Sequence, residues 1–181
     1  MKTYVLLVSR TFPKGHKREG EETFFVKKIL NNLTGGYCYM ICKSKNDCKL
    51  CSFEKYSNEI KLHTCRKNYE LWAKRIKEVQ EGKAILSLRY WQDERGRSVK
   101  GNEQVEFARL GKDSGVGVQE LCFINSEIER PCIFDKGYAG RENIKTLAKN
   151  DGLSIDNFKD WFKNYDLSKP MAIIQFTEFR Y

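Results

Sequence analysis

Apolar residues recur along the chain at two spacings, and each spacing predicts one kind of secondary structure. Alternation of apolar and polar residues, as in KAILSLRYW at residues 83–91, is typical of a strand with one buried face. The ranges predicted as strands are 2–10, 61–66, 83–91, 103–110, 118–124 and 171–179. Residues 125–140 show neither spacing, and we predict that they are irregular.

Apolar residues spaced by three and four positions predict helices, because residues at that spacing share one helix face. Phe25 and Ile29 belong to a first such helix, whose acidic first turn is predicted to start at Glu21. A second helix is predicted at about 68–81. In the C-terminal third, a short helix precedes a longer one, and Ser154 is well suited to be the N-cap of the longer helix.

The order of these elements favours an α+β domain built on a small, mostly antiparallel β-barrel with flanking helices. The run from residue 83 to residue 124 has strands joined by hairpin-like turns, whereas a doubly wound sheet requires regular alternation of strand and helix. The chain of 181 residues is long enough for one domain with its own core, so we expect a single domain at 1–181. Within it, residues 36–58 are interpreted as a Cys-rich insertion.

The chain carries a formal net charge of +9, which favours a polyanionic partner such as nucleic acid. The ordinary alternative is a soluble protein that is rich in lysine. A basic loop, TFPKGHKREG, occupies residues 11–20. No apolar run reaches the roughly 18 residues of a membrane helix, and the apolar core at Tyr4–Val8 is too short for a signal peptide. We therefore expect a cytoplasmic protein with no membrane partner.

Four of the seven cysteines cluster in CYMICKSKNDCKLC, with the spacing C-x3-C-x5-C-x2-C. These four residues are Cys38, Cys42, Cys48 and Cys51. Their thiolates could together coordinate one zinc ion, although only the second pair has the common C-x2-C spacing. Cys38 also lies in an apolar run, where a buried thiol is the alternative. Zinc is therefore one of two interpretations of this cluster, and no other cofactor is required.

The segment KLHTCR, residues 61–66, combines polar side chains that a ligand site would use. In a strand, Lys61 would face one side, with Thr64 and Arg66 on the other. These three residues form the pattern K-x-x-T-x-R, which resembles the motif of the ASCH domains, a branch of the PUA-like superfamily. LAKNDGLSIDNF at 147–158 resembles the family segment A-x-x-E-G-F-S-x-x-x-F, and MAIIQFTEF resembles its closing strand.

The resemblance covers about residues 21–34 and 59–180. It departs from the family at Glu59, where glycine is usual. In a strand, His63 would point away from Thr64, so packing is its favoured role.

The resemblance implies that the protein binds RNA, in preference to DNA, or a modified nucleobase or nucleoside. A basic cleft at the mouth of the barrel would hold the ligand through Lys61, Thr64 and Arg66, because lysine and arginine attract phosphate. Tyr90 and Trp91 end a predicted strand beside a polar turn, where aromatic rings can stack on a base. The simpler interpretation of the motif is a solvated, basic strand edge.

A second interpretation is an amidohydrolase that acts on an acylated nucleoside such as N4-acetylcytidine, because the family includes such enzymes. The resemblance then makes Thr64 the nucleophile and Lys61 its activating base. The family's glutamate falls on Asp151, which is one methylene shorter, and a displacement of about 1 Å can cost about 100-fold in rate. Asp-Gly is also a common turn before a helix. An ASCH-type ribonuclease and a zinc-stabilised interaction protein are the remaining alternatives.

Overall fold

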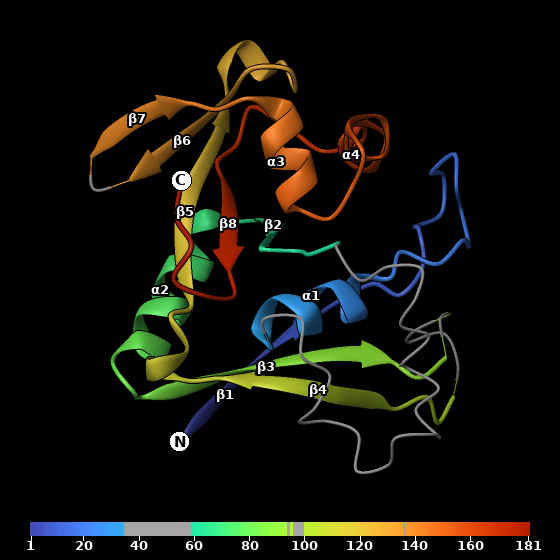
Figure 1. The fold of residues 1–181 in the computed structure, drawn as a ribbon, viewed down its shortest axis with the longest axis vertical. Coiled ribbons are helices and arrows are strands. Elements are labelled where there is room, and N and C mark those ends of the chain that lie inside the picture. Colours follow the sequence, from blue (N-terminus) through green and yellow to red (C-terminus); the bar gives the residue numbers. More distant parts are fainter. Residues whose placement is uncertain (35–58, 94, 96–99, 136) are drawn as a thin grey trace.

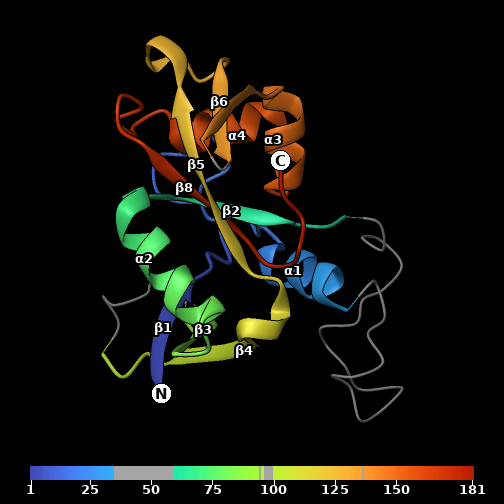
Figure 2. The same cartoon turned by 90° about the vertical axis from the view of Figure 1, so that its left-hand side faces the viewer.

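The computed structural model describes residues 1–34, 59–93, 95, 100–135 and 137–181. In these ranges the chain forms two β-sheets and four α-helices, which Figure 1 shows from one side and Figure 2 after a quarter turn. The expected insertion, with the cysteine cluster Cys38, Cys42, Cys48 and Cys51, lies outside the described residues. The zinc interpretation therefore stays a prediction.

A three-stranded sheet forms the lower layer in Figure 1. Its strands, in spatial order, are β1 (Lys2–Leu7), β3 (Ala84–Trp91) and β4 (Gln104–Leu110). β1 and β3 are parallel, whereas β3 and β4 are antiparallel. Because parallel strands need a long crossover, the connection from β1 to β3 includes two helices and the first strand of the other sheet.

The second sheet has five strands, and all of its ladders are antiparallel. In spatial order they are β2 (His63–Lys67), β8 (Met171–Gln175), β5 (Gly117–Phe123), β6 (Pro131–Asp135) and β7 (Tyr138–Arg141). β8 is buried along its whole length between β2 and β5. The strand that carries the sequence motif, β2, is therefore fixed in register by the C-terminal strand, with Thr64 opposite Ile174.

The helices are α1 (Phe25–Leu33), α2 (Tyr69–Gln80), α3 (Ile144–Asn150) and α4 (Ile155–Phe162). α2 packs against β3 of one sheet and β5 of the other, and α1 lies between the three-stranded sheet and β2 in both views (Figures 1 and 2). The core that joins these elements includes the fully buried residues Ile76, Leu86, Leu121, Phe158 and Ile173. Burial of each such side chain contributes about 1.5–3 kcal/mol. None of the described helices combines the length and the apolar character that crossing a membrane requires.

The α+β class and the mostly antiparallel pairing predicted from the sequence are confirmed. The predicted closed barrel is not confirmed, because the described strands form two separate sheets and no ladder joins one sheet to the other. The prediction that residues 125–140 are irregular is wrong, because they contain β6 and most of β7. Every residue of β7 is exposed, so this strand has no apolar face that could produce an alternating pattern.

The first helix also begins later than predicted, at Phe25 rather than Glu21. Glu22 pairs with Thr11 in an isolated β-bridge, so this part of the chain is extended. The hydroxyl of Thr23 then accepts a hydrogen bond from the N–H of Phe25 at 3.3 Å. The acidic residues before the helix therefore close the basic loop and do not form a first turn.

We predict that Gly152→Ala lowers the free energy of unfolding by about 2 kcal/mol. Gly152 has a φ of +76°, and a Cβ there would lie 3.3 Å from Cβ of Lys61 and 3.3 Å from Cδ of Lys28. Gly20→Ala is the matched control, because Gly20 has a φ of +79° with nothing within 4 Å of its Cβ position. Urea denaturation should show a loss of only about 1 kcal/mol for the control. Equal losses would contradict the close approach at Gly152.

Candidate functional site

The segment that leads into β2 is held by backbone hydrogen bonds to two helices and to the residue that follows β8. The N–H of Lys61 donates to the carbonyl of Lys28 in α1 at 3.2 Å, and the N–H of Leu62 donates to the carbonyl of Asn150 in α3 at 2.8 Å. The carbonyl of Leu62 accepts from the N–H of Phe176, just after β8, at 3.1 Å. These bonds fix the direction in which the Lys61 side chain leaves the backbone.

Lys61 and Asp151 form a buried ion pair between positions 90 residues apart in the sequence. The ammonium nitrogen of Lys61 lies 2.9 Å from Oδ1 of Asp151 and donates a short hydrogen bond to the main-chain carbonyl of the same residue. It also lies 4.0 Å from the centre of the Phe25 ring, which adds a cation–π contact. Among the described residues no donor meets Oδ1 in hydrogen-bond geometry, so this oxygen is balanced by charge alone.

The position of Asp151 explains why the lysine is needed there. Asp151 is the C-cap of α3, and a negative charge at the C-terminal end of a helix is unfavourable. Lys61 offsets both the carboxylate and the helix-end carbonyl. Burial nevertheless lowers the pKa of Lys61 and raises the pKa of Asp151, because each charged form loses its water, and their mutual attraction offsets part of both shifts.

A neutral hydrogen-bonded group lies beside the ion pair, on the same side of β2. Nε2 of His63 lies 2.7 Å from the hydroxyl of Tyr181, which also accepts a hydrogen bond from Nδ2 of Asn150 at 3.0 Å. Burial lowers the pKa of His63 well below 6.5, and the positive charge of Lys61 acts in the same direction. Burial likewise raises the pKa of the Cys65 thiol well above 9.0. Both side chains are therefore uncharged at neutral pH.

Three atoms in this region are of the types that ligate metal ions and lie close together. Nδ1 of His63, Sγ of Cys65 and a carboxylate oxygen of Asp151 lie within 4.8 Å of one another, and all three residues are buried. Imidazole, thiolate and carboxylate would together suit zinc. However, the ammonium of Lys61 already supplies a positive charge 2.9 Å from the Asp151 carboxylate. A metal ion would have to displace that charge, so the geometry favours a hydrogen-bonded core cluster.

Thr64 and Arg66 lie on the opposite face of β2 and interact with each other. The guanidinium of Arg66 donates to Oγ1 of Thr64 at 2.7 Å and to the carbonyl of Leu7, the last residue of β1, at 2.7 Å. Arg66 therefore links the two sheets. The described contacts include no hydrogen bond between Lys61 and Thr64, so the structure brings Lys61 to Asp151 but not to Thr64.

Tyr90 and Trp91 lie at the end of β3, in the three-stranded sheet. The Tyr90 ring packs 6.1 Å from the ring of Phe107, and the guanidinium of Arg10 lies 5.3 Å from its centre. Trp91 is half-buried and pairs with Gln104. The ring contacts of Tyr90 thus belong to this sheet and to the loop after β1, and not to the Lys61–Asp151 pair.

A pocket of about 650 Å³ lies next to the ion pair. It is lined by Phe12, Arg18, Thr23, Phe24, Lys28, Glu59, Ile60, Lys149, Asn150, Gly152, Leu153, Ser154 and Asn157. The chain neighbours of Lys61 and Asp151 therefore form part of its wall, while the pair itself is buried behind them. Its other residues come from the basic loop, from the start of α1 and from the turn between α3 and α4.

The pocket combines aromatic rings with cations. The guanidinium of Arg18 lies 4.6 Å from the centre of the Phe12 ring, and the ammonium of Lys28 donates to the carbonyl of Gly152 at 2.8 Å. Phe24 has a φ of +59°, a strained conformation for an aromatic residue, and such strain clusters at ligand sites. Lys149 adds a third positive charge. Phe12 is 4% exposed and its ring stacks on His16, so the half-buried Phe24 is the aromatic residue of the lining that a planar ligand would contact, and the cations would attract an anion.

We compared the chain with protein-family models, with curated proteins and with solved structures. None of them matches it. The similarity to ASCH domains thus rests on the sequence motifs alone.

Burial separates the ion pair and the pocket into different roles. Lys61 is 1% exposed, and Thr64 and Asp151 are each 4% exposed, so a substrate cannot reach these side chains without a rearrangement of the protein. Several pocket residues are exposed or half-buried, among them Phe24, Ile60 and Lys149, so a ligand can reach this part of the wall. Sequence reasoning identified both members of the pair but missed the pocket residues Phe12, Phe24 and Lys28. The basic loop at residues 11–20 was the one sequence signal that pointed to this region.

We predict that Lys61→Met and Asp151→Asn each lower the free energy of unfolding by about 3–5 kcal/mol. Each change leaves one buried charge without its partner. The double variant should lose clearly less than the sum of the two, because it leaves no unpaired charge. Urea denaturation of the wild-type protein, the two single variants and the double variant at pH 7 measures the coupling free energy between Lys61 and Asp151. Strictly additive losses would show that the two side chains do not stabilise each other.

Acidification should destabilise the protein through His63. Because the pKa of His63 is lowered well below 6.5 in the fold, the unfolded chain takes up a proton near pH 6.5 that the folded chain does not. The free energy of unfolding should therefore fall below pH 6.5, by up to about 1.4 kcal/mol per pH unit from this group.

The variant His63→Gln isolates this contribution, because it should show a smaller decrease between pH 7 and pH 5. The raised pKa of Asp151 acts in the opposite sense. Because Oδ1 of Asp151 lies 3.5 Å from Nδ1 of His63, the same comparison in the Asp151→Asn background separates the two groups. Parallel pH profiles of the two proteins would contradict the assignment to His63.

Proposed function

We propose that the protein binds single-stranded RNA, or a modified nucleobase or nucleoside, in the pocket beside the Lys61–Asp151 pair. The observation that carries the proposal is the lining itself, in which the half-buried Phe24 and three cations, with Glu59 as the one acidic residue, line a pocket of about 650 Å³. Base stacking on aromatic rings and attraction of phosphate by lysine and arginine are the two common means of binding single strands. The net charge of +9 supports the same class of partner.

The proposed ligand contacts differ from those that the sequence motif predicts. Arg66, expected from the motif to contact the ligand, uses its guanidinium to hold Thr64 and Leu7. Arg18 and Lys149 take its place as the ligand-binding cations, and Phe24 takes the place of Tyr90 and Trp91 as the stacking ring. We retain the relation to PUA-like domains as part of the proposal, supported by the contact between the two motif residues Lys61 and Asp151.

Binding of a short, fluorescently labelled single-stranded RNA should fall steeply as the salt concentration rises. Arg18→Ala and Lys149→Ala should each weaken binding about three- to tenfold and reduce the slope of log K against log salt by about 0.7. Fluorescence anisotropy between about 50 and 200 mM salt measures both quantities.

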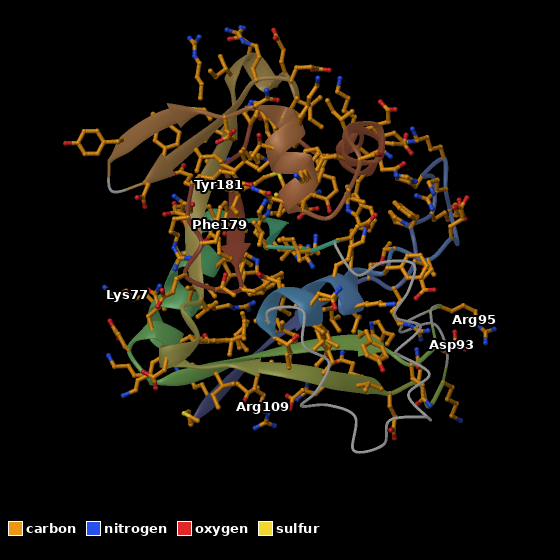
Figure 3. All side chains as sticks on the ribbon, viewed as in Figure 1. Lys77, Asp93, Arg95, Arg109, Phe179 and Tyr181 are labelled. Carbon is orange, nitrogen blue, oxygen red and sulfur yellow. The ribbon has the colours of Figure 1, made fainter. Side chains whose placement is uncertain are left out.

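Lys77→Ala is the matched control. Lys77 is exposed on α2, on the side of the molecule away from α4 and the basic loop (Figure 3). It makes the same change in net charge, and we expect almost unchanged binding. Equal effects of all three substitutions would mean that RNA responds to total charge and not to this pocket.

A second candidate is hydrolysis of an acylated nucleoside, and the Lys61–Asp151 contact favours it. Burial lowers the pKa of Lys61, and a lysine with a lowered pKa can act as a general base. The reaction would require a rearrangement that exposes Lys61 and brings it to Thr64. Release of cytidine from N4-acetylcytidine, abolished by both Lys61→Ala and Thr64→Ala, would establish this activity. No release at high enzyme concentration would exclude this substrate.

A further inference from the structure

Lys28 presents a fixed positive charge at the pocket. Its ammonium donates to the carbonyl of Gly152 at 2.8 Å, and its backbone carbonyl accepts the N–H of Lys61. Its side chain is only 12% exposed. An ammonium has three N–H donors, so after the bond to Gly152 two donors remain for an anion.

The anion that Lys28 now contacts is the carboxylate of Glu59, at 2.6 Å. The two partners differ in burial, because the side chain of Glu59 is 57% exposed whereas that of Lys28 is 12% exposed. A largely exposed carboxylate is well solvated and loses little when it leaves an ion pair, whereas a buried ammonium needs an anionic partner. Glu59 is therefore the replaceable member of the pair.

The surroundings of Lys28 suit a phosphate group better than a second carboxylate. Arg18, Lys149 and Ser154, the N-cap of α4, line the same pocket. Arg18 is paired with Glu21 at 2.7 Å, and the Glu21 side chain is 57% exposed, so this carboxylate can also give way to a phosphate. A phosphate group has more acceptor oxygens and more negative charge than a carboxylate, so it can use several of these groups at once. Among the described residues, the carboxylate of Glu59 forms an ion pair with Lys28 and with no other cation.

We propose that Lys28 is the phosphate subsite of the pocket, and that the carboxylate of Glu59 competes with the ligand phosphate for its ammonium. The inference rests on the proposed function, because it assigns the phosphate of the RNA or nucleotide to a named position. Glu59 then lowers the affinity of the pocket for its ligand, because the ligand phosphate has to displace the Glu59 carboxylate from the Lys28 ammonium.

The direct test is Glu59→Gln, which removes the competing charge and leaves the Lys28–Gly152 hydrogen bond intact. Affinity for an RNA with a 5′-phosphate should rise about three- to tenfold, the effect of relieving an ion pair of about 1 kcal/mol. Glu81→Gln is the matched control, because Glu81 also forms an ion pair of 2.6 Å, with Lys83, but lies at the end of α2. The control should change affinity by less than about twofold.

A double-mutant cycle with Lys28→Gln shows whether the gain acts through Lys28. In the Lys28→Gln protein, Glu59→Gln should no longer raise affinity, because no ammonium is left to compete for. If Glu59→Gln raised the affinity equally in the wild-type and the Lys28→Gln proteins, Lys28 would not be the phosphate subsite. Thermal melting of each variant confirms that the folded protein is being titrated, and Glu59→Gln alone keeps the test open if Lys28→Gln does not fold.

Two further ligands separate this inference from the proposed function. RNA with a 5′-hydroxyl should gain less from Glu59→Gln than RNA with a 5′-phosphate, and an equal gain would overturn a terminal-phosphate subsite while RNA binding stands. Pyrophosphate and a nucleoside 5′-monophosphate probe the subsite without an RNA chain. If no RNA binds, but Glu59→Gln still binds pyrophosphate in a Lys28-dependent way, the subsite stands and the proposed function fails.

Discussion

The buried contact between Lys61 and Asp151 is the interaction on which the rest of the site depends. It joins the entry of β2 to the end of α3, two segments that the chain separates by 90 residues. The lysine offsets a carboxylate and a carbonyl that both lie at the negative end of a helix. Gly152 follows at once, and its missing Cβ lets the α3–α4 turn approach Lys61. The ion pair thus fixes the backbone that forms one wall of the pocket.

This arrangement separates the buried polar groups from the proposed binding surface. The charged pair and His63 are closed to solvent and, with the half-buried Tyr181, stabilise the junction of β2, α3 and β8. On the other side of the wall, Phe24 and the cations of the pocket are the groups that the proposed ligand would reach. Because buried charges cost free energy unless paired, a closed Lys61–Asp151 pair is better suited to positioning a binding surface than to chemistry in the conformation described here.

The sequence predicted much of the fold and half of the site, for identifiable reasons. Period-two alternation located β3 and β4, and the motif resemblance selected Lys61 and Asp151, which are in contact. Alternation also placed Lys61 and Thr64 on opposite faces, and the structure keeps them apart. The β6–β7 hairpin was missed because β7 has no buried face. The pocket was missed because the basic loop reaches it by long-range bonds, such as Lys17 N–H to Asp160 at 2.6 Å, that no local pattern encodes.

The measurement that tests the account most directly is an amide chemical-shift titration of the protein with a short single-stranded RNA. The account predicts that the largest changes occur at Phe24, Lys28, Gly152 and Ser154, which line the pocket, and that Lys77 on α2 is unaffected. Saturable changes confined to these residues would support the binding function. Changes centred on Tyr90 and Trp91, or none at any RNA concentration, would contradict it.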